Sequence, residues 1–127
     1  MNSYFVDKVH RARLLHLMVA DGTHPGDCER ISLFYIVSGN TDLYYKRNAI
    51  YDFKEHLIKQ CLVHKEVDFS SGMKAMIRLG FNLYNGYQDS YTTPYDLFGN
   101  LGKKNQFLAE NAIHLRFHED DFYDLFE

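Results

Sequence analysis

Residues that begin or end helices recur along this chain at intervals of about one helix length. Asp27 precedes the apolar run Ile31–Val37, and Thr93 with Pro94 opens a later segment. Asp and Thr side chains accept hydrogen bonds from the free N–H groups of a first helical turn, and proline fits that turn because it has no N–H to leave unpaired. Strand-rich folds instead place turn residues about every 8–12 residues. The sequence therefore predicts an all-α fold, a single compact orthogonal helical domain of five to seven helices over residues 1–127.

The spacing of apolar residues places these helices along the chain. The run Ile31–Val37 is apolar on nearly every side, which is typical of a central buried helix, although so short a run also has a strand as its alternative interpretation. We expect Ser3 to cap the first helix and Gly39 to end the second in the left-handed conformation. The predicted helices span residues 3–19, 28–38, 49–62, 72–85, a short segment from 94, and 104–117, with a short acidic helix in the tail 118–127. The predicted core contains Phe34, Ile36, Phe53, Leu57, Ile77, Phe81, Ile113 and Leu115.

Composition excludes several classes of protein. Hydrophobic residues make up 46% of the 127 residues and charged residues 24%, which excludes a disordered chain. No apolar run approaches the roughly 18 residues of a membrane span, and the first residues show no signal-peptide pattern. Two cysteines, Cys28 and Cys61, are too few for a disulfide framework. We therefore expect two reduced thiols and a cytoplasmic location.

Charge is distributed unevenly along the chain. Residues 46–65 contain five Lys or Arg against two acidic residues, whereas the tail 118–127 contains five acidic residues and no Lys or Arg. Phe122, Leu125 and Phe126 give this tail an apolar edge at helical spacing. We expect the tail to dock through these three residues onto the basic third helix of its own chain or of a dimer partner. Apolar burial supplies most of the binding energy in such a contact, because exposed ion pairs contribute only about 0–1 kcal/mol each.

Four polar residues are the strongest candidates for a site. Arg78, Asn82 and Asn85 are four and three residues apart, so they share one face of a predicted helix, and they interrupt an apolar segment. The simpler interpretation is a buried polar network in which Arg78 pairs with a carboxylate, with Asp52 as the first choice. The alternative is a pocket for an anionic or polar ligand, formed by the same four residues and anchored by Arg78.

Three further groups contain potential metal ligands without the spacing of a known metal site. The groups are Asp21, His24 and Asp27 with Cys28 and Glu29 adjacent; Cys61 and His64; and His114 and His118. Each lacks the complementary ligands that zinc signatures contain. We therefore expect no resident metal ion and no cofactor, and no residue is assigned a catalytic role.

Several segments of the chain resemble a known family. They are Ser32–Ile36, Tyr51–Phe53, Arg78–Gly86, which contains Phe-Asn-Leu-Tyr-Asn-Gly, and Thr93–Phe98. Over most of residues 25–117 the chain resembles a family of small proteins of unknown function, found mainly in Gram-positive bacteria and their mobile elements. The resemblance implies a bacterial or phage cytoplasmic setting. It implies no activity, so it carries over no catalytic residue.

Three classes of function remain. The surplus of aromatic residues and the absence of catalytic signatures favour a protein-interaction or structural module, with a protein partner or a second copy of the chain. A small enzyme or ligand-binding protein with the pocket described above is the alternative. Nucleic-acid binding is the least favoured class, because the isoelectric point is near 6.1 and the predicted helices 72–85 and 94–100 are too far apart for a helix-turn-helix.

Overall fold

The computed structural model describes residues 4–64, 67–118, 120–121 and 124–126. In this part of the chain, seven α-helices and one two-stranded hairpin confirm the predicted, mostly helical fold. No helix among the described residues is long and apolar enough to cross a membrane. The elements are α1 (Lys8–Asp21), α2 (Cys28–Gly39), α3 (Thr41–Tyr45), α4 (Arg47–Ile50), β1 (Tyr51–Asp52), β2 (Leu57–Ile58), α5 (Ser71–Asn85), α6 (Pro94–Phe98), α7 (Lys103–Phe117) and the 3-10 helix η1 (Asp124–Phe126).

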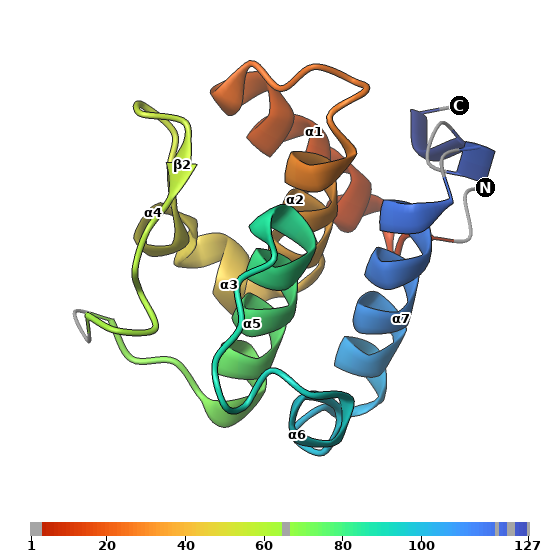
Figure 1. Ribbon diagram of the computed structural model, residues 1–127. Coiled ribbons are helices and arrows are strands. Elements are labelled where there is room, and N and C mark those ends of the chain that lie inside the picture. Colours follow the sequence, from red (N-terminus) through yellow and green to blue (C-terminus); the bar gives the residue numbers. More distant parts are fainter. Residues whose placement is uncertain (1–3, 65–66, 119, 122–123, 127) are drawn as a thin grey trace.

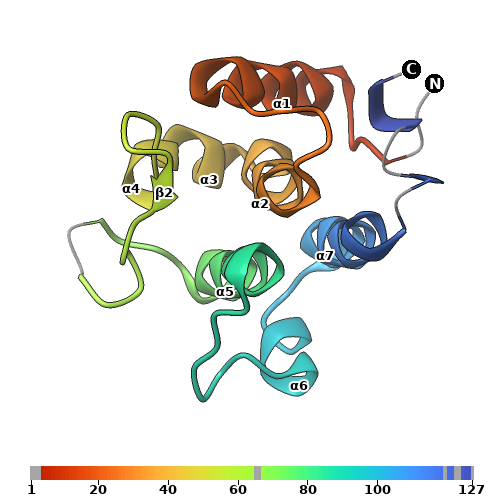
Figure 2. The ribbon, with the colours of Figure 1, turned by 45° about the horizontal axis from the view of Figure 1, so that its top comes forward.

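Helix α2 is the centre of the molecule. It packs against α1 on one side and against α5 and α7 on the other (Figures 1 and 2). Every residue from Ile31 to Gly39 is buried, as expected for a helix that is apolar nearly all round. Asp27 caps it by accepting a hydrogen bond from the backbone N–H of Arg30. The predicted second helix is therefore confirmed, and the strand alternative for this run is excluded.

Capping residues begin the later helices close to the predicted residues 72 and 94. Ser70 accepts a hydrogen bond from the N–H of Met73 at the start of α5, and Gly86 ends that helix at φ 81°. Thr93 accepts from the N–H of Asp96, with Pro94 in the first turn of α6. Helix α7 spans residues 103–117, close to the predicted 104–117.

The ends of the first two helices differ from the prediction in detail. Helix α2 ends at Gly39, close to the predicted end, but Gly39 is its last helical residue and is not left-handed, and a Cβ there would come within 2.3 Å of Leu108 Cδ2. Close packing of two helices explains this glycine better than a turn does. Helix α1 is capped by Asp7 rather than Ser3, which lies outside the described residues, and it ends at Asp21, with Gly22 as its left-handed cap, rather than before Ala20.

The predicted helix 49–62 is wrong after Ile50. Helix α4 ends at Ile50, and β1 pairs antiparallel with β2, with Tyr51 opposite Ile58. The cause is local, because Asp52 Oδ1 accepts hydrogen bonds from the backbone N–H groups of Lys54 and Glu55. Such a bond from an Asp side chain to the backbone two residues on favours a turn over a helix.

The predicted core is partly confirmed. Phe34, Ile36, Ile77, Phe81 and Leu115 are buried. Three other members of the predicted core are more accessible: Phe53 is only partly buried, and the side chains of Leu57 and Ile113 are exposed. For Leu57 the reason is the hairpin, which replaces the helical face that was expected to bury it.

The C-terminal tail docks at a different place from the one predicted. Leu125 is buried and Phe126 packs against the core, whereas Phe122 lies outside the described residues. Helix η1 lies beside the N-terminal segment and the end of α7, on the opposite side of the molecule from α4 and the hairpin (Figures 1 and 2). The predicted docking onto the basic segment 46–65 of the same chain is therefore wrong for the described part of the tail, and docking onto that of a dimer partner stays a prediction.

Candidate binding groove at the hairpin

A buried carboxylate at the end of α1 anchors the hairpin. Asp21 accepts hydrogen bonds from Tyr51 Oη (2.7 Å), His56 Nδ1 (2.8 Å) and Thr23 Oγ1 (2.6 Å). Burial alone raises the pKa of Asp21, but these three bonds outweigh it and hold the pKa below its ordinary value. The carboxylate is therefore charged, and it joins α1 to both ends of the hairpin.

Arg30 extends this network from α2. Its Nε donates to Tyr51 Oη (3.0 Å), and its two terminal nitrogens donate to Asp27 Oδ2 (2.9 Å) and to the carbonyl of His56 (3.0 Å). Burial, more than any other effect, raises the pKa of Tyr51 above its ordinary value, so the phenol stays protonated. The hairpin is thus held by donors and acceptors from two helices, and it is a fixed part of the fold.

The turn of the hairpin contains a strained residue. His56 has φ 61°, in the left-handed region of backbone conformation that residues other than glycine rarely adopt. Its ring is about half exposed but bonded to Asp21 through Nδ1. This bond stabilises the turn geometry and offsets the strain, which costs on the order of 1 kcal/mol.

Among the described residues, β1 is the one strand that pairs with β2, so the other edge of β2 has no strand beside it. The N–H of Lys59 donates to the carbonyl of Ile50 (2.8 Å), so these two residues form a hydrogen-bonded pair of the ladder. In an antiparallel hairpin such pairs alternate with pairs that are not bonded. Ile58, opposite Tyr51, occupies the position without bonds. Its N–H and C=O therefore point out of the hairpin.

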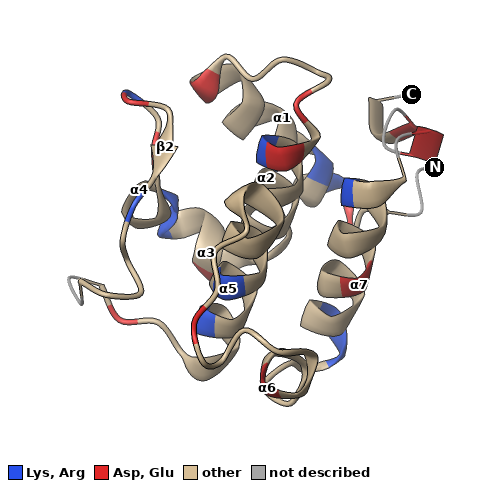
Figure 3. Ribbon diagram, in the orientation of Figure 1, with Lys and Arg blue, Asp and Glu red and all other residues tan. Residues whose placement is uncertain are grey.

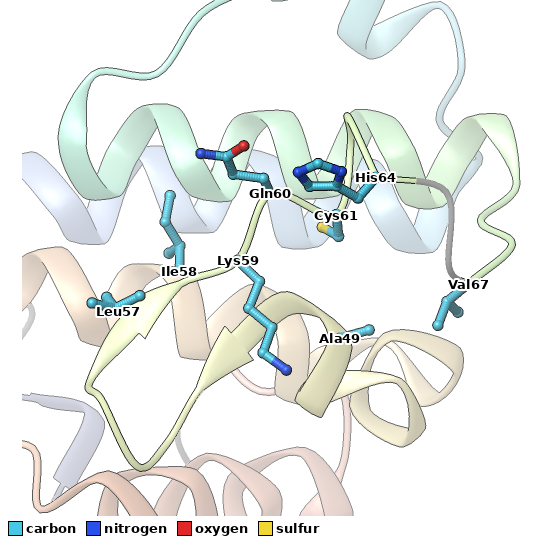
Figure 4. Close-up of a pocket in the computed structure, with 8 residues that line it drawn as sticks. All are labelled: Ala49, Leu57, Ile58, Lys59, Gln60, Cys61, His64 and Val67. Atoms are coloured by element: carbon cyan, nitrogen blue, oxygen red, sulfur yellow. The ribbon is translucent and has the colours of Figure 1, made fainter.

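Two cavities flank β2, and both are lined by Leu57 and Ile58. We call β2 and these two cavities the β2 groove. The first cavity, of about 520 Å³, is also lined by Ala49, Lys59, Gln60, Cys61, His64 and Val67 (Figure 4). The second, of about 560 Å³, is also lined by Asp27, Glu29, Arg30, Tyr84 and Asn85.

The two cavities differ in charge. Among the described residues, Lys59 is the one Lys or Arg that lines the first cavity, and no Asp or Glu lines it. Burial raises the pKa of the Cys61 thiol to about 11, so this thiol is neutral and is a poor nucleophile or metal ligand. In the second cavity Arg30 and Asp27 form an ion pair, so their charges cancel. The Glu29 carboxylate therefore sets the charge of this cavity. The groove is therefore basic at one end and acidic at the other.

The structure brings three of the four residues of the predicted pocket to the loop that follows α5, in a polar network, and places the fourth in the hairpin. Arg78 Nε bonds to Asp89 Oδ2 (2.9 Å), so the predicted pairing with Asp52 is wrong, although the expected carboxylate partner exists. Asn82 donates to the carbonyl of Tyr87, and Asn85 Oδ1 accepts from the N–H of the same residue. Asp52 forms the hairpin turn instead. Of the four, Asn85 lines the β2 groove.

Sequence reasoning named Asp21, Asp27, Glu29, Cys61 and His64 as potential metal ligands but did not predict that they surround one hairpin. Asp21 is 30 residues from Tyr51 and 35 from His56 along the chain, so no local spacing pattern links them. The one available signal was the Asp52 turn, which predicts a hairpin if it is given more weight than the apolar spacing. Among the described residues there is no group of three His, Cys, Asp or Glu that is arranged to hold a metal ion.

Comparison with known proteins gives a family but no function. A family model described as a family of unknown function (DUF6075) matches residues 1–126. No curated protein matches the chain, and no solved structure does so either.

Proposed function

Since the chain belongs to the DUF6075 family, whose function is unknown, we propose from its geometry that it is a protein-interaction module that binds an extended segment of a partner protein along β2. The observation that carries the proposal is the outward N–H and C=O of Ile58 between two cavities. An extended peptide adds to a strand edge through main-chain hydrogen bonds, and pockets on either side of the edge select its side chains.

The charges at the two ends of the groove set the orientation in which the partner segment binds. An acidic side chain of the partner segment fits the end of the groove at Lys59, and a basic side chain fits the end at Glu29. Apolar side chains between them cover the half-exposed Leu57. The hairpin is already fixed by Asp21 and Arg30, so binding does not have to order it, and the affinity is higher for that reason.

The cellular location of the protein is part of the same proposal. The sequence resemblance supports a bacterial or phage cytoplasm, where a reduced Cys61 is stable beside the groove. A second copy of the chain is the simplest alternative partner, because two β2 edges are able to pair with each other.

The test selects linear peptides from a phage-displayed random library and measures their affinity for the purified full chain by fluorescence anisotropy. We expect Leu57→Glu to weaken binding about tenfold or more, because it puts a carboxylate at the centre of the groove. Val19→Glu is the matched control, since Val19 is also an exposed apolar residue but lies on α1. Hydrogen exchange of the Ile58 amide should slow when the selected peptide binds.

Two results would contradict a peptide partner. The first is equal affinity of the selected peptides for wild type and Leu57→Glu, with no protection of the Ile58 amide. The second is a doubled sedimentation mass that Leu57→Glu returns to that of one chain, which would replace the peptide partner by a second copy.

A further inference from the structure

A cluster of arginine and tyrosine side chains lies on the outer surface where α1 meets α3 and α4. We call it the arginine–tyrosine surface, and it consists of Arg13, His16, Tyr44, Tyr45 and Arg47. The guanidinium of Arg13 lies 4.7 Å from the ring centre of Tyr44 and 5.4 Å from that of Tyr45. The guanidinium of Arg47 lies 4.5 Å from the ring centre of Tyr44. His16 Nδ1 is hydrogen-bonded to Tyr44 Oη.

Arg13 and Arg47, the two arginines of this surface, have no carboxylate partner among the described residues. Arg13 donates to Thr41 Oγ1 and Arg47 donates to the carbonyl of Tyr44, and both acceptors are neutral. Neither arginine forms an ion pair with any of the described residues. By contrast, Arg30 and Arg78 are paired with carboxylates. The cluster therefore retains its positive charge, and Figure 3 shows Lys and Arg on α1 and α4.

The aromatic part of the surface is open on one side. Tyr44 is half-buried, with two guanidinium groups against its ring. Tyr45, next to it, is 68% exposed, and of the described cations Arg13 alone lies over its ring. An exposed ring with one guanidinium group against it and a second guanidinium group against the neighbouring Tyr44 ring has the composition of a base-stacking site.

From this arrangement we propose that the arginine–tyrosine surface binds single-stranded nucleic acid, with one base stacked on Tyr45 and the adjacent phosphates bonded to Arg13 and Arg47. Guanidinium groups bind phosphate oxygens in a bidentate manner, and bases of any sequence stack on an aromatic face. An acidic peptide satisfies the arginines but leaves the Tyr45 ring unused. A duplex needs a longer basic stripe than two arginines provide.

This surface is independent of the β2 groove, because the two share no residue. The sequence did not reveal it, since Arg13 is 31 residues before Tyr44 and the fold alone brings them together. The overall charge of −3 excludes a general electrostatic binder, but it leaves room for a local site of this kind.

The test measures fluorescence anisotropy of labelled oligothymidylate and oligouridylate, each about twelve nucleotides long to cover one short site, against the full-length chain at low and physiological salt. We expect Tyr45→Ala to weaken binding about tenfold and Tyr45→Phe to preserve it. Arg13→Gln and Arg47→Gln should each weaken binding and reduce the slope of log K against log salt by about one. Tyr95→Ala is the matched control, because Tyr95 is an exposed tyrosine on α6 without a guanidinium against its ring.

Several outcomes would overturn the proposal. They are an absence of binding to both oligonucleotides at low salt, binding that Tyr45→Ala leaves unchanged, and displacement of the oligonucleotide by polyglutamate of equal charge. The last would make the surface a docking site for acidic protein segments. A difference between the thymidylate and uridylate arms would identify the kind of strand that the surface prefers.

Discussion

His10 is buried near the start of α1, and both of its ring nitrogens have partners. Nε2 donates to the carbonyl of Tyr35 (2.9 Å), and Nδ1 accepts from the backbone N–H of Val6 (3.2 Å). A proton on Nδ1 would face a donor, so the folded protein holds this imidazole neutral. Burial is the largest cause that lowers the pKa of His10 to about 4, from its ordinary value of 6.5.

This histidine makes stability depend on pH. Between about pH 4 and 6.5 the unfolded chain binds a proton at His10 and the folded protein does not, so the free energy of unfolding falls as the pH falls through this window. We expect His10 to account for a loss of about 3 kcal/mol between pH 7 and 4. Urea titrations across this range measure it, and His10→Gln should flatten the profile. A wild-type profile as flat as that of the variant would show that the imidazole is protonated in the fold.

Phe81 belongs to the predicted core, and its substitution tests that prediction. It lies on α5, is 2% exposed, and has its ring against that of Tyr87. We expect Phe81→Ala to lower the free energy of unfolding by about 3–5 kcal/mol, because it leaves a cavity that the surrounding helices cannot fill. Phe117→Ala, at an exposed position, should change it by less than about 1 kcal/mol. Equal effects of the two substitutions in urea titrations would contradict this placement of Phe81.

Helices α2 and α7 approach each other closely at Gly39. A Cβ there would lie 2.3 Å from Leu108 Cδ2 and 3.0 Å from the His10 ring, and both neighbours are buried. We expect Gly39→Ala to lower the free energy of unfolding by about 1–3 kcal/mol through overpacking. Gly102→Ala is the control, because nothing lies within 4 Å of a Cβ at that position. If the substitution at Gly39 stabilises the protein in thermal unfolding, the helices are not in contact there.

The elements that the sequence predicts well are those whose ends are marked locally. Asp27, Ser70 and Thr93 act on N–H groups within three residues, so their role is readable without the fold. The hairpin was missed because its apolar residues also fit a helical spacing, and the turn formed by Asp52 decided between the two. Gly39 was expected to be left-handed because the close packing against Leu108 that requires this glycine leaves no local sequence signal.

At the scale of the whole molecule, the contacts that the sequence did not predict are those between residues far apart along the chain. The expected carboxylate partner of Arg78 exists, but it is Asp89 on the following loop rather than Asp52. The network that anchors the hairpin joins helical residues to hairpin residues 21 to 35 positions away, and the arginine–tyrosine surface joins Arg13 to Tyr44, 31 positions away. Spacing patterns describe one helix face at a time, so neither arrangement was accessible from the sequence.

The two ends of the described chain are joined at α7. The Tyr4 ring stacks on that of His114 at 6.1 Å between centres, and His114 Nε2 is bonded to Asp121 Oδ2 (2.6 Å). Burial, followed by the charges of Asp121 and Asp124, raises the pKa of Tyr4. The buried Leu125 adds the apolar part of the contact. The tail therefore closes the N-terminal segment onto the core.

Removal of the tail should expose this junction. Burying one leucine side chain contributes about 1.5–3 kcal/mol, so we expect deletion of residues 119–127 to lower the Tm by roughly 5–10 °C. Leu125→Ala should reproduce most of the loss, whereas Tyr95→Ala, at an exposed position, should not change the Tm. Because the contact lies within one chain, sedimentation should give the same mass of one chain for the truncated and full-length proteins. An unchanged Tm would show that the tail does not stabilise the fold, and a halved mass would show that it joins two chains.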